Sequence, residues 1–388
     1  FDWMSANQST VIQLIKGMQE NRLHNCENEK RWEWERIQVK LFGINIKSLT
    51  LNQFQSAGSI FIYEVSSIFI TYFAATAVIR GEMTLGMMLS IQFIMGQLHE
   101  PINAIIRFIY LAQDAKMSLE RLNAYHKVED EEPVRQNKVM QISGNADMVI
   151  KDLTFRYEEA AYDALKNINI VIPARKTTAI VGTSGSGKTT LIKLLLKFYK
   201  PTSGSIRLGP TDLEDLSNVH WRAKCGVVLQ DGFIYTDTIA RNIAIKGEID
   251  TERLESAIQA ANIQEHVRAL PHGYNSRLEN GEDMLSHGQK QRLLIARAVY
   301  KNPDFVFFDE ATNALDAHNE KIIMQNINEF ARNKTVIVVA HRLSTVKNAD
   351  QIIVLDRGEV VESGTHLELV EKKAFYFNLV RNQLELGK

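Results

Sequence analysis

A short glycine-rich segment between a predicted strand and a predicted helix constrains this chain more than any other feature. The apolar run 176–181 (KTTAIV) leads directly into the loop 182–189 (GTSGSGKT), and an amphipathic run, 191–198 (LIKLLLKF), follows. The spacing GxxxxGK[ST] after a strand and before a helix is the P-loop pattern. Short β-branched runs then alternate with helical stretches, which is typical of a largely parallel sheet. The sequence therefore predicts an α/β P-loop domain.

The residue types in this loop are those that phosphate binding requires. Glycine at 182, 185 and 187 lets the backbone bend so that its N–H groups point at phosphate oxygens, and the helix that follows adds its positive N-terminus. Lys188 can reach the β- and γ-phosphates, and the Thr189 hydroxyl can ligate Mg2+. The predicted nucleotide-binding residues of the loop are Gly182, Thr183, Ser184, Gly185, Ser186, Gly187, Lys188, Thr189 and Thr190.

A second apolar strand ends in two carboxylates. Residues 305–310 read FVFFDE. Asp309 is expected to hold the coordination sphere of the metal, and Glu310 to act beside the γ-phosphate as a general base or a water-orienting group. The second carboxylate distinguishes a hydrolase from a protein that only binds nucleotide. The P-loop upstream disfavours the alternative, an acidic turn after a strand.

Length and composition exclude several other classes. At roughly 150 residues per domain, 388 residues predict two or three domains. The 45 basic and 46 acidic residues leave a net charge of -1, so the basic field that nucleic-acid binding uses is absent and we expect no nucleic-acid partner. The two cysteines, Cys26 and Cys225, lie far apart without a Cys/His ligand pattern, which argues against a disulfide framework and a structural zinc site.

The N-terminal third, residues 1–125, has a different character. Residues 57–79 contain a single charge, Glu64, and are long enough to cross a hydrocarbon core of about 30 Å. A second apolar run, 83–112, follows after a short polar break. We expect a pair of transmembrane helices, with Glu64 facing other helices or a wet cavity. A soluble helical hairpin buried in a large core is the alternative.

Charge and polarity predict the orientation of this hairpin and the nature of the segment after it. Basic residues lie before the hairpin (Lys30, Arg31, Arg36, Lys40, Lys47) and after it (Lys116, Arg121, Lys127), whereas the connecting turn holds only Arg80. By the positive-inside rule both ends are cytoplasmic, which predicts a multi-pass protein of the cytoplasmic (inner) membrane, in contact with membrane lipid.

Residues 126–146 are polar and contain proline and glycine, so they are predicted to link the hairpin to a P-loop domain at 147–388.

A third motif lies between the P-loop and the carboxylates. Residues 285–292 read LSHGQKQR and open a helical run. A P-loop, LSxGQ and a DE strand in this order resemble the ATP-binding cassette (ABC) family. The resemblance implies a cassette with a helical subdomain that hydrolyses ATP with Mg2+. The two spans resemble the last pair of a six-helix exporter half-transporter, so four further spans are expected upstream of Phe1.

The resemblance also assigns residues outside the P-loop. Tyr157 matches the aromatic residue that stacks on adenine, and Gln230 matches the glutamine that contacts Mg2+ or the attacking water. His341 matches the histidine that contacts the γ-phosphate. Asp316 closes a segment, 313–316 (NALD), that matches the loop communicating between two cassettes. Lys188, Gln230, Glu310 and His341 are thus the expected catalytic residues.

In the same family the LSxGQ signature of one cassette covers the ATP held by the P-loop of a second cassette. Ser286, Gly288 and Gln289 are the signature residues expected to bind it, and His287 replaces a second glycine. The resemblance therefore implies a homodimer or heterodimer of cassettes. A short helix around residues 7–14 is expected to dock on the cassette near Gln230.

The resemblance is strongest to bacterial exporters of peptides, which often carry an N-terminal processing peptidase. Peptide export is therefore the expected function, and lipid or drug export is the alternative. Two further hypotheses are a soluble cassette ATPase of the repair or translation kind and a membrane protein that binds ATP without transporting.

Overall fold

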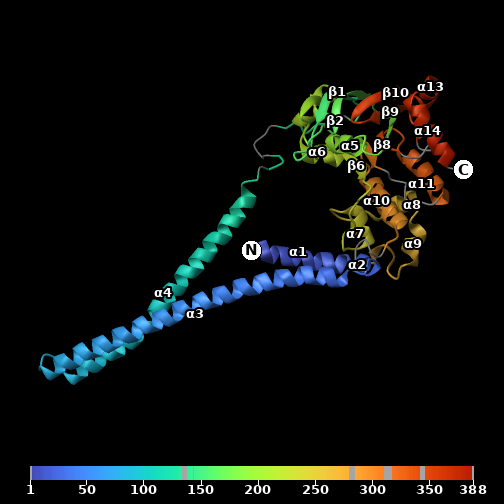
Figure 1. Cartoon of the computed structure of the whole chain (residues 1–388). Coiled ribbons are helices and arrows are strands. Elements are labelled where there is room, and N and C mark those ends of the chain that lie inside the picture. Colours follow the sequence, from blue (N-terminus) through green and yellow to red (C-terminus); the bar gives the residue numbers. More distant parts are fainter. Residues whose placement is uncertain are drawn as a thin grey trace. The chain divides into compact units, whose positions relative to one another are not determined.

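The structure is a computed structural model of the chain (Figure 1). It describes residues 2–128, 130–132, 138–142, 144–278, 285–309, 317–340 and 346–386. The chain divides into two compact units, Phe1–Glu129 and Asp130–Lys388. The first is helical and the second is built around two β-sheets.

The first unit consists of helices joined by tight turns: α1 (Asp2–Lys16), α2 (Met18–Leu23), α3 (Glu27–Ile79) and α4 (Leu85–His126). Asn7 of α1 accepts hydrogen bonds from two side chains of α3, at 2.9 Å from Trp34 Nε1 and 2.6 Å from Gln38 Nε2. The prediction of a short helix around residues 7–14 is wrong in its length, because these residues lie inside α1, which has 15 residues. Docking of this segment on the cassette near Gln230 stays a prediction. The short helix of this region is α2.

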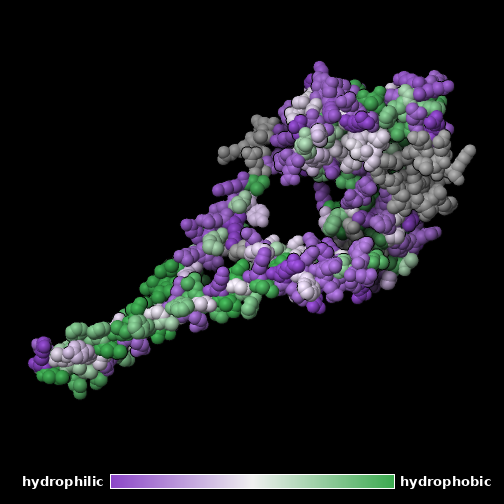
Figure 2. All heavy atoms as spheres, in the orientation of Figure 1, coloured by the Kyte–Doolittle hydropathy of each residue, from purple (hydrophilic) through white to green (hydrophobic). Residues whose placement is uncertain are grey.

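The helices α3 and α4 form a hairpin that leaves apolar side chains uncovered. Figure 2 shows green, apolar atoms gathered over both helices, and Phe61, Phe73 and Phe108 are all more than half exposed. Polar contacts between the helices are specific, since Tyr63 Oη donates to the Met95 carbonyl at 3.2 Å and Tyr110 Oη to Gln55 Oε1 at 2.9 Å. So much exposed apolar surface requires lipid or further helices to cover it.

Among the described helices, α3 meets the length and composition that crossing a membrane requires. The predicted first span, 57–79, forms its C-terminal part. The helix α4 contains most of the predicted second span, 83–112, including Pro101, but it does not meet the same criteria. The second span thus stays a prediction.

The second unit contains two sheets. The four-stranded sheet has the order β2-β1-β4-β5, and its strands are antiparallel. The six-stranded sheet has the order β10-β9-β3-β8-β7-β6, and among its described strands only β10 runs antiparallel to its neighbour. The strands are β1 (Met148–Phe155), β2 (Leu165–Ile172), β3 (Thr177–Gly182), β4 (Ser203–Leu208), β5 (Thr211–Asp212), β6 (Cys225–Val228), β7 (Phe305–Asp309), β8 (Thr335–Val339), β9 (Gln351–Asp356) and β10 (Glu359–Gly364).

Helices cover both faces of the six-stranded sheet. The helices α7 to α10 form a helical subdomain on one side, as the ABC resemblance implies. The helices of this unit are α5 (Lys188–Leu195), α6 (Asn218–Lys224), α7 (Ile239–Ala244), α8 (Thr251–Ala260), α9 (Gln264–Ala269), α10 (His287–Lys301), α11 (Ala317–Phe330), α13 (His366–Lys372) and α14 (Phe375–Leu386), with 3-10 turns at Leu213–Asp215 and Gly273–Asn275.

Burial on both faces of the six-stranded sheet explains why its parallel strands are continuous apolar runs. All five residues of β7 and all five of β8 are buried. Along each strand the side chains alternate between two apolar clusters, one shared with α5 and the antiparallel sheet and the other with the helical subdomain. A parallel sheet covered on both faces needs such continuous apolar strands. Because β3, β6, β7 and β8 run parallel, their carboxyl ends lie at one edge of the sheet.

The linker is attached to the sheet-containing unit just after the hairpin. Both terminal nitrogens of the Arg222 guanidinium donate to the Glu131 carboxylate, Nη1 to Oε2 at 2.9 Å and Nη2 to Oε1. Hydrogen bonding to Arg222 lowers the pKa of Glu131. Glu132 Oε2 accepts from the Asn218 backbone N–H at 2.8 Å. Further on, Val139 pairs with Leu216 in a parallel bridge. The predicted linker thus docks on the segment around α6.

Two leucines on α13 test the packing. Leu369 is completely buried in the cluster on the helical-subdomain side, whereas Leu367 is 74% exposed. Leu369→Ala should lower the free energy of unfolding by about 2–5 kcal/mol, because it removes apolar contacts and leaves a cavity. The control Leu367→Ala should change it by no more than about 0.5 kcal/mol. Urea titration of both variants measures the difference, and equal midpoints would contradict the assigned core.

Candidate nucleotide-binding site

The backbone of the loop between β3 and α5 has the shape that its glycines predict. Gly187, the N-cap of α5, has φ 100°, a left-handed conformation that other residues rarely adopt. At Gly182 an added Cβ would lie 2.0 Å from the Leu355 carbonyl oxygen of the neighbouring strand β9. Neither position can take a side chain without moving the backbone. The loop therefore has the close-packed turn of a P-loop.

Lys188 places a buried cation inside this loop. Its side chain is only 6% exposed, and Nζ donates to the carbonyl oxygens of Gly182 at 3.1 Å and Thr183 at 2.8 Å. The ammonium group is therefore held over the loop from which it extends. An anion bound in the loop would meet this positive charge in a partly desolvated setting, where its attraction is stronger than in water.

A buried hydroxyl in the same loop fits a phosphate ligand. Ser186 is 1% exposed, and its Oγ has no hydrogen-bond partner among the described residues. An unsatisfied buried hydroxyl costs free energy. A phosphate oxygen inside the loop would provide the missing acceptor. The loop thus suits the polyphosphate chain of a nucleotide.

Two predicted metal ligands meet beside the loop. Thr189 Oγ1 donates to Asp309 Oδ1 at 3.4 Å, and Asp309 is 2% exposed at the end of β7. Hydroxyl and carboxylate oxygens suit Mg2+, which keeps waters and substrate phosphates as its other ligands. The described residues contain no group of three His, Cys, Asp or Glu side chains able to hold a metal by themselves.

The strand register brings together the ends of the strands that precede the other predicted catalytic residues in the sequence. Gln230 is exposed and lies two residues beyond β6, which is parallel to β7. Asp309 of β7 pairs with Val339 of β8. Glu310 and His341 follow these strands in the sequence but lie outside the described residues, as does Asp316. The topology is thus consistent with their predicted roles without placing their side chains.

Tyr157 belongs to a small aromatic group beside the P-loop helix. Its hydroxyl lies 3.1 Å from Thr190 Oγ1, on α5. Its ring packs edge-on against Phe155, with centroids 4.9 Å apart, and against Tyr199, with centroids 5.3 Å apart. Adenine stacking by Tyr157 stays a prediction. The sequence did not indicate Tyr199, because a tyrosine in the turn after a helix carries no recognisable signal. Tyr157 and Tyr199, packed against the buried Phe155, thus leave part of their rings exposed near the nucleotide loop.

The predicted signature begins the helix α10. Ser286 is its N-cap and forms a capping box with Gln289: Ser286 Oγ accepts from the Gln289 backbone N–H at 3.2 Å, and Gln289 Oε1 accepts from the Ser286 backbone N–H at 2.9 Å. Gly288 lies in the first turn of the helix. His287 is the first helical residue and is exposed, so it replaces glycine without backbone strain.

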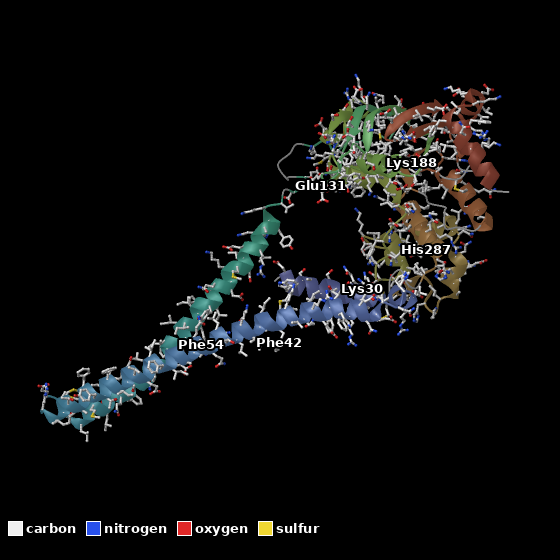
Figure 3. The ribbon with its side chains drawn as sticks, in the orientation of Figure 1. Lys30, Phe42, Phe54, Glu131, Lys188 and His287 are labelled. Carbon is white, nitrogen blue, oxygen red and sulfur yellow. The ribbon has the colours of Figure 1, made fainter. Side chains whose placement is uncertain are left out.

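The P-loop and the signature lie in different lobes of the same unit. Figure 3 shows Lys188 in the lobe built around the sheets and His287 in the helical subdomain, well separated. One copy therefore does not bring its own signature onto its own P-loop.

Comparisons with known proteins identify the family of this domain. The ABC transporter family model matches residues 165–313. The chain is 38% identical over 337 residues to the alpha-hemolysin translocation ATP-binding protein of Escherichia coli O157:H7, covering 86% of this chain and 46% of that protein. It is 33% identical over 374 residues to the lactococcin-G-processing and transport ATP-binding protein of Lactococcus lactis subsp. lactis, covering 96% and 53%.

A further relative and a solved structure extend the similarity. The leukotoxin translocation ATP-binding protein of Mannheimia glucosida is 35% identical over 386 residues, covering 98% of this chain and 54% of that protein. A structure of a bacterial Atm1-family ABC exporter with ATP bound superposes with a TM-score of 0.92 at 25% identity, covering 98% of this chain and 67% of that one. The chain spans about half the length of these curated relatives.

The fold and the site together define a P-loop nucleotide-binding protein with an attached helical unit. More specifically, the chain carries an ATP-binding domain of the ABC transporter family and has the fold of an ABC exporter. Its P-loop domain accordingly binds ATP.

Lys188→Ala should weaken ATP binding by at least tenfold, because it removes the one buried cation that this loop holds among its described residues. A titration with a fluorescent ATP analogue measures the change. Lys200→Ala is the matched control, since Lys200 is exposed a few residues beyond α5. Unchanged affinity in Lys188→Ala would contradict the assigned role of the lysine.

Proposed function

We propose that the chain hydrolyses ATP to drive export of a substrate across the cytoplasmic membrane, as half of a dimeric ABC transporter. The observation that carries this proposal is the combination, in one chain of exporter fold, of a P-loop cassette with a helical hairpin whose apolar surface is uncovered. The hairpin argues against a soluble cassette ATPase of the repair or translation kind.

The catalytic roles follow from the edge where the parallel strands end. We propose that Lys188 and the loop amides bind the phosphates, and that Thr189, Asp309 and Gln230 hold Mg2+. When bound, Mg2+ supplies positive charge where negative charge develops on the transferred phosphoryl group. Glu310 orients or deprotonates the attacking water and His341 holds the γ-phosphate, since both follow strands that end at this edge.

The separation of the two lobes supports a dimer in which sites are shared. We propose that the Ser286 turn of one copy covers the nucleotide bound at Lys188 of a second copy, in head-to-tail pairing. The γ-phosphate would then bind both copies, and hydrolysis would remove that shared charge. Differential affinity for the closed pair drives the conformational cycle. A homodimer is the simplest assembly, and a heterodimer is the alternative.

The proposed substrate is a peptide or a polypeptide. The curated relatives are named for translocation of hemolysin and leukotoxin and for processing and transport of lactococcin G. Lipid or drug export is the alternative. Uptake of labelled peptides into inverted membrane vesicles, dependent on ATP, distinguishes the two.

Glu310→Gln should retain ATP binding and abolish hydrolysis, because the amide can no longer activate water while the P-loop is unchanged. Phosphate release and fluorescent-ATP titration measure the two properties separately. Undiminished hydrolysis would remove Glu310 from the mechanism.

A crosslink between copies tests the shared site. Ser184 of the P-loop and His287 of the signature are both exposed. With Cys26 replaced by serine, Ser184→Cys and His287→Cys should form a disulfide between copies when ATP is present in the Glu310→Gln background. The pair Lys200→Cys and His287→Cys is the control and should not crosslink. Absence of the ATP-dependent crosslink would contradict head-to-tail pairing.

A further inference from the structure

A histidine of the helical subdomain contacts the signature turn from inside the protein. His266 lies on α9, and its Nδ1 is 3.1 Å from the Nε2 of Gln289. The side chain is half-buried, and its second nitrogen, Nε2, is fully buried with no hydrogen-bond partner among the described residues. A histidine with one unsatisfied nitrogen is a costly way to fill space. The hydrogen bond to Gln289 is the polar contact that explains why a histidine occupies this position.

The capping box fixes the direction of this bond. Gln289 Oε1 already accepts from the Ser286 backbone N–H at 2.9 Å. The amide nitrogen of Gln289 must therefore face His266, and it can only donate. Nδ1 of His266 must accept, so the imidazole is neutral with its proton on Nε2. Burial, assisted by the nearby Arg292, lowers the pKa of His266, which agrees with a neutral ring.

A second contact holds the same helical turn. Arg292 donates through Nε to the Gly288 carbonyl at 3.4 Å and through Nη1 to the Asn262 carbonyl at 2.8 Å. Asn262 lies between α8 and α9. The first turns of α10 are thus tied to the α8–α9 region at two points, through Gln289 to His266 and through Arg292, which lies on α10 itself, to Asn262.

We propose that His266 is a positioning residue for the signature. By accepting from the Gln289 amide it fixes the orientation of that amide, and through it the backbone N–H and the hydroxyl of Ser286. This inference rests on the proposed function, in which Ser286 meets the ATP of a second copy. His266 itself touches no nucleotide. Its effect appears only when two cassettes close on ATP.

Two substitutions separate positioning from packing. His266→Asn keeps an acceptor oxygen near the place of Nδ1, although it loses ring volume. His266→Leu keeps apolar volume but offers no acceptor. The matched control is His272→Leu, because His272 is an exposed histidine of the same subdomain. If His266 only fills space, the leucine variant should perform at least as well as the asparagine variant.

The experiment uses the full chain and four measurements: thermal unfolding, fluorescent-ATP affinity, ATP hydrolysis, and the ATP-dependent crosslink between Ser184→Cys and His287→Cys, made in the Glu310→Gln background. In His266→Leu we expect ATP affinity to be unchanged, since the P-loop is intact. Hydrolysis and the crosslink rate should both fall by about tenfold, as expected for the loss of one buried hydrogen bond. His266→Asn should restore both to within about threefold of the parent, and His272→Leu should match the parent.

Three outcomes would overturn the proposal. In the first, the folded leucine variant keeps parental hydrolysis and crosslinking. In the second, His266→Leu fails to fold, and His266→Asn folds but loses as much hydrolysis and crosslinking as was expected of the leucine variant. In the third, the parent itself shows no ATP-dependent crosslink, which overturns the shared site together with His266, whereas the first two outcomes leave the shared site intact.

Discussion

Parallel pairing of β3, β8 and β7 is the constraint on which the site depends. Because β3 pairs with β8, and β8 with β7, in the same direction, their carboxyl ends meet at one edge. That edge holds the P-loop after β3 and Asp309 at the end of β7. Thr189 and Asp309 are 120 positions apart in the sequence, yet their side chains are hydrogen-bonded. Open α/β sheets generally bind ligands at this edge.

The candidate functional groups of the cassette are divided between its two lobes. The lobe built on the sheets carries the buried cation Lys188, the predicted metal ligands and the aromatic group around Tyr157. The helical subdomain carries Ser286, whose orientation depends on Gln289 and, through it, on His266. Hydrogen bonds linked in series strengthen one another. The orientation of the signature is therefore set in part by residues that are not proposed to contact the nucleotide. This separation is the physical basis of our proposal that two copies share each site.

Sequence-based prediction and structure agree best for elements whose conformation depends on residues that are neighbours in the chain. The strand, loop and helix around Lys188 were predictable because the glycine spacing allows a single backbone path and the helix adds its dipole. Asp309 was predictable because a carboxylate directly after four apolar residues must lie at the end of a buried strand. The signature helix was predictable from Ser286 and Gln289, whose spacing is that of a capping box. Prediction failed for the N-terminal residues 7–14, since helical periodicity alone does not indicate where α1 ends.

The amino-acid sequence by itself thus determined the class of fold, the phosphate-binding loop and the apolar segment 57–79 that forms the C-terminal part of α3, because each depends on residues close together in the chain. Tertiary structure alone decided which distant groups meet. Nothing in the spacing of His266 and Gln289, or of Tyr157 and Tyr199, indicates that they touch. Nor does the sequence indicate that Arg222 would hold the linker through Glu131. Such contacts depend on how helices and sheets pack, and packing is set by the burial of the whole apolar core rather than by any local pattern.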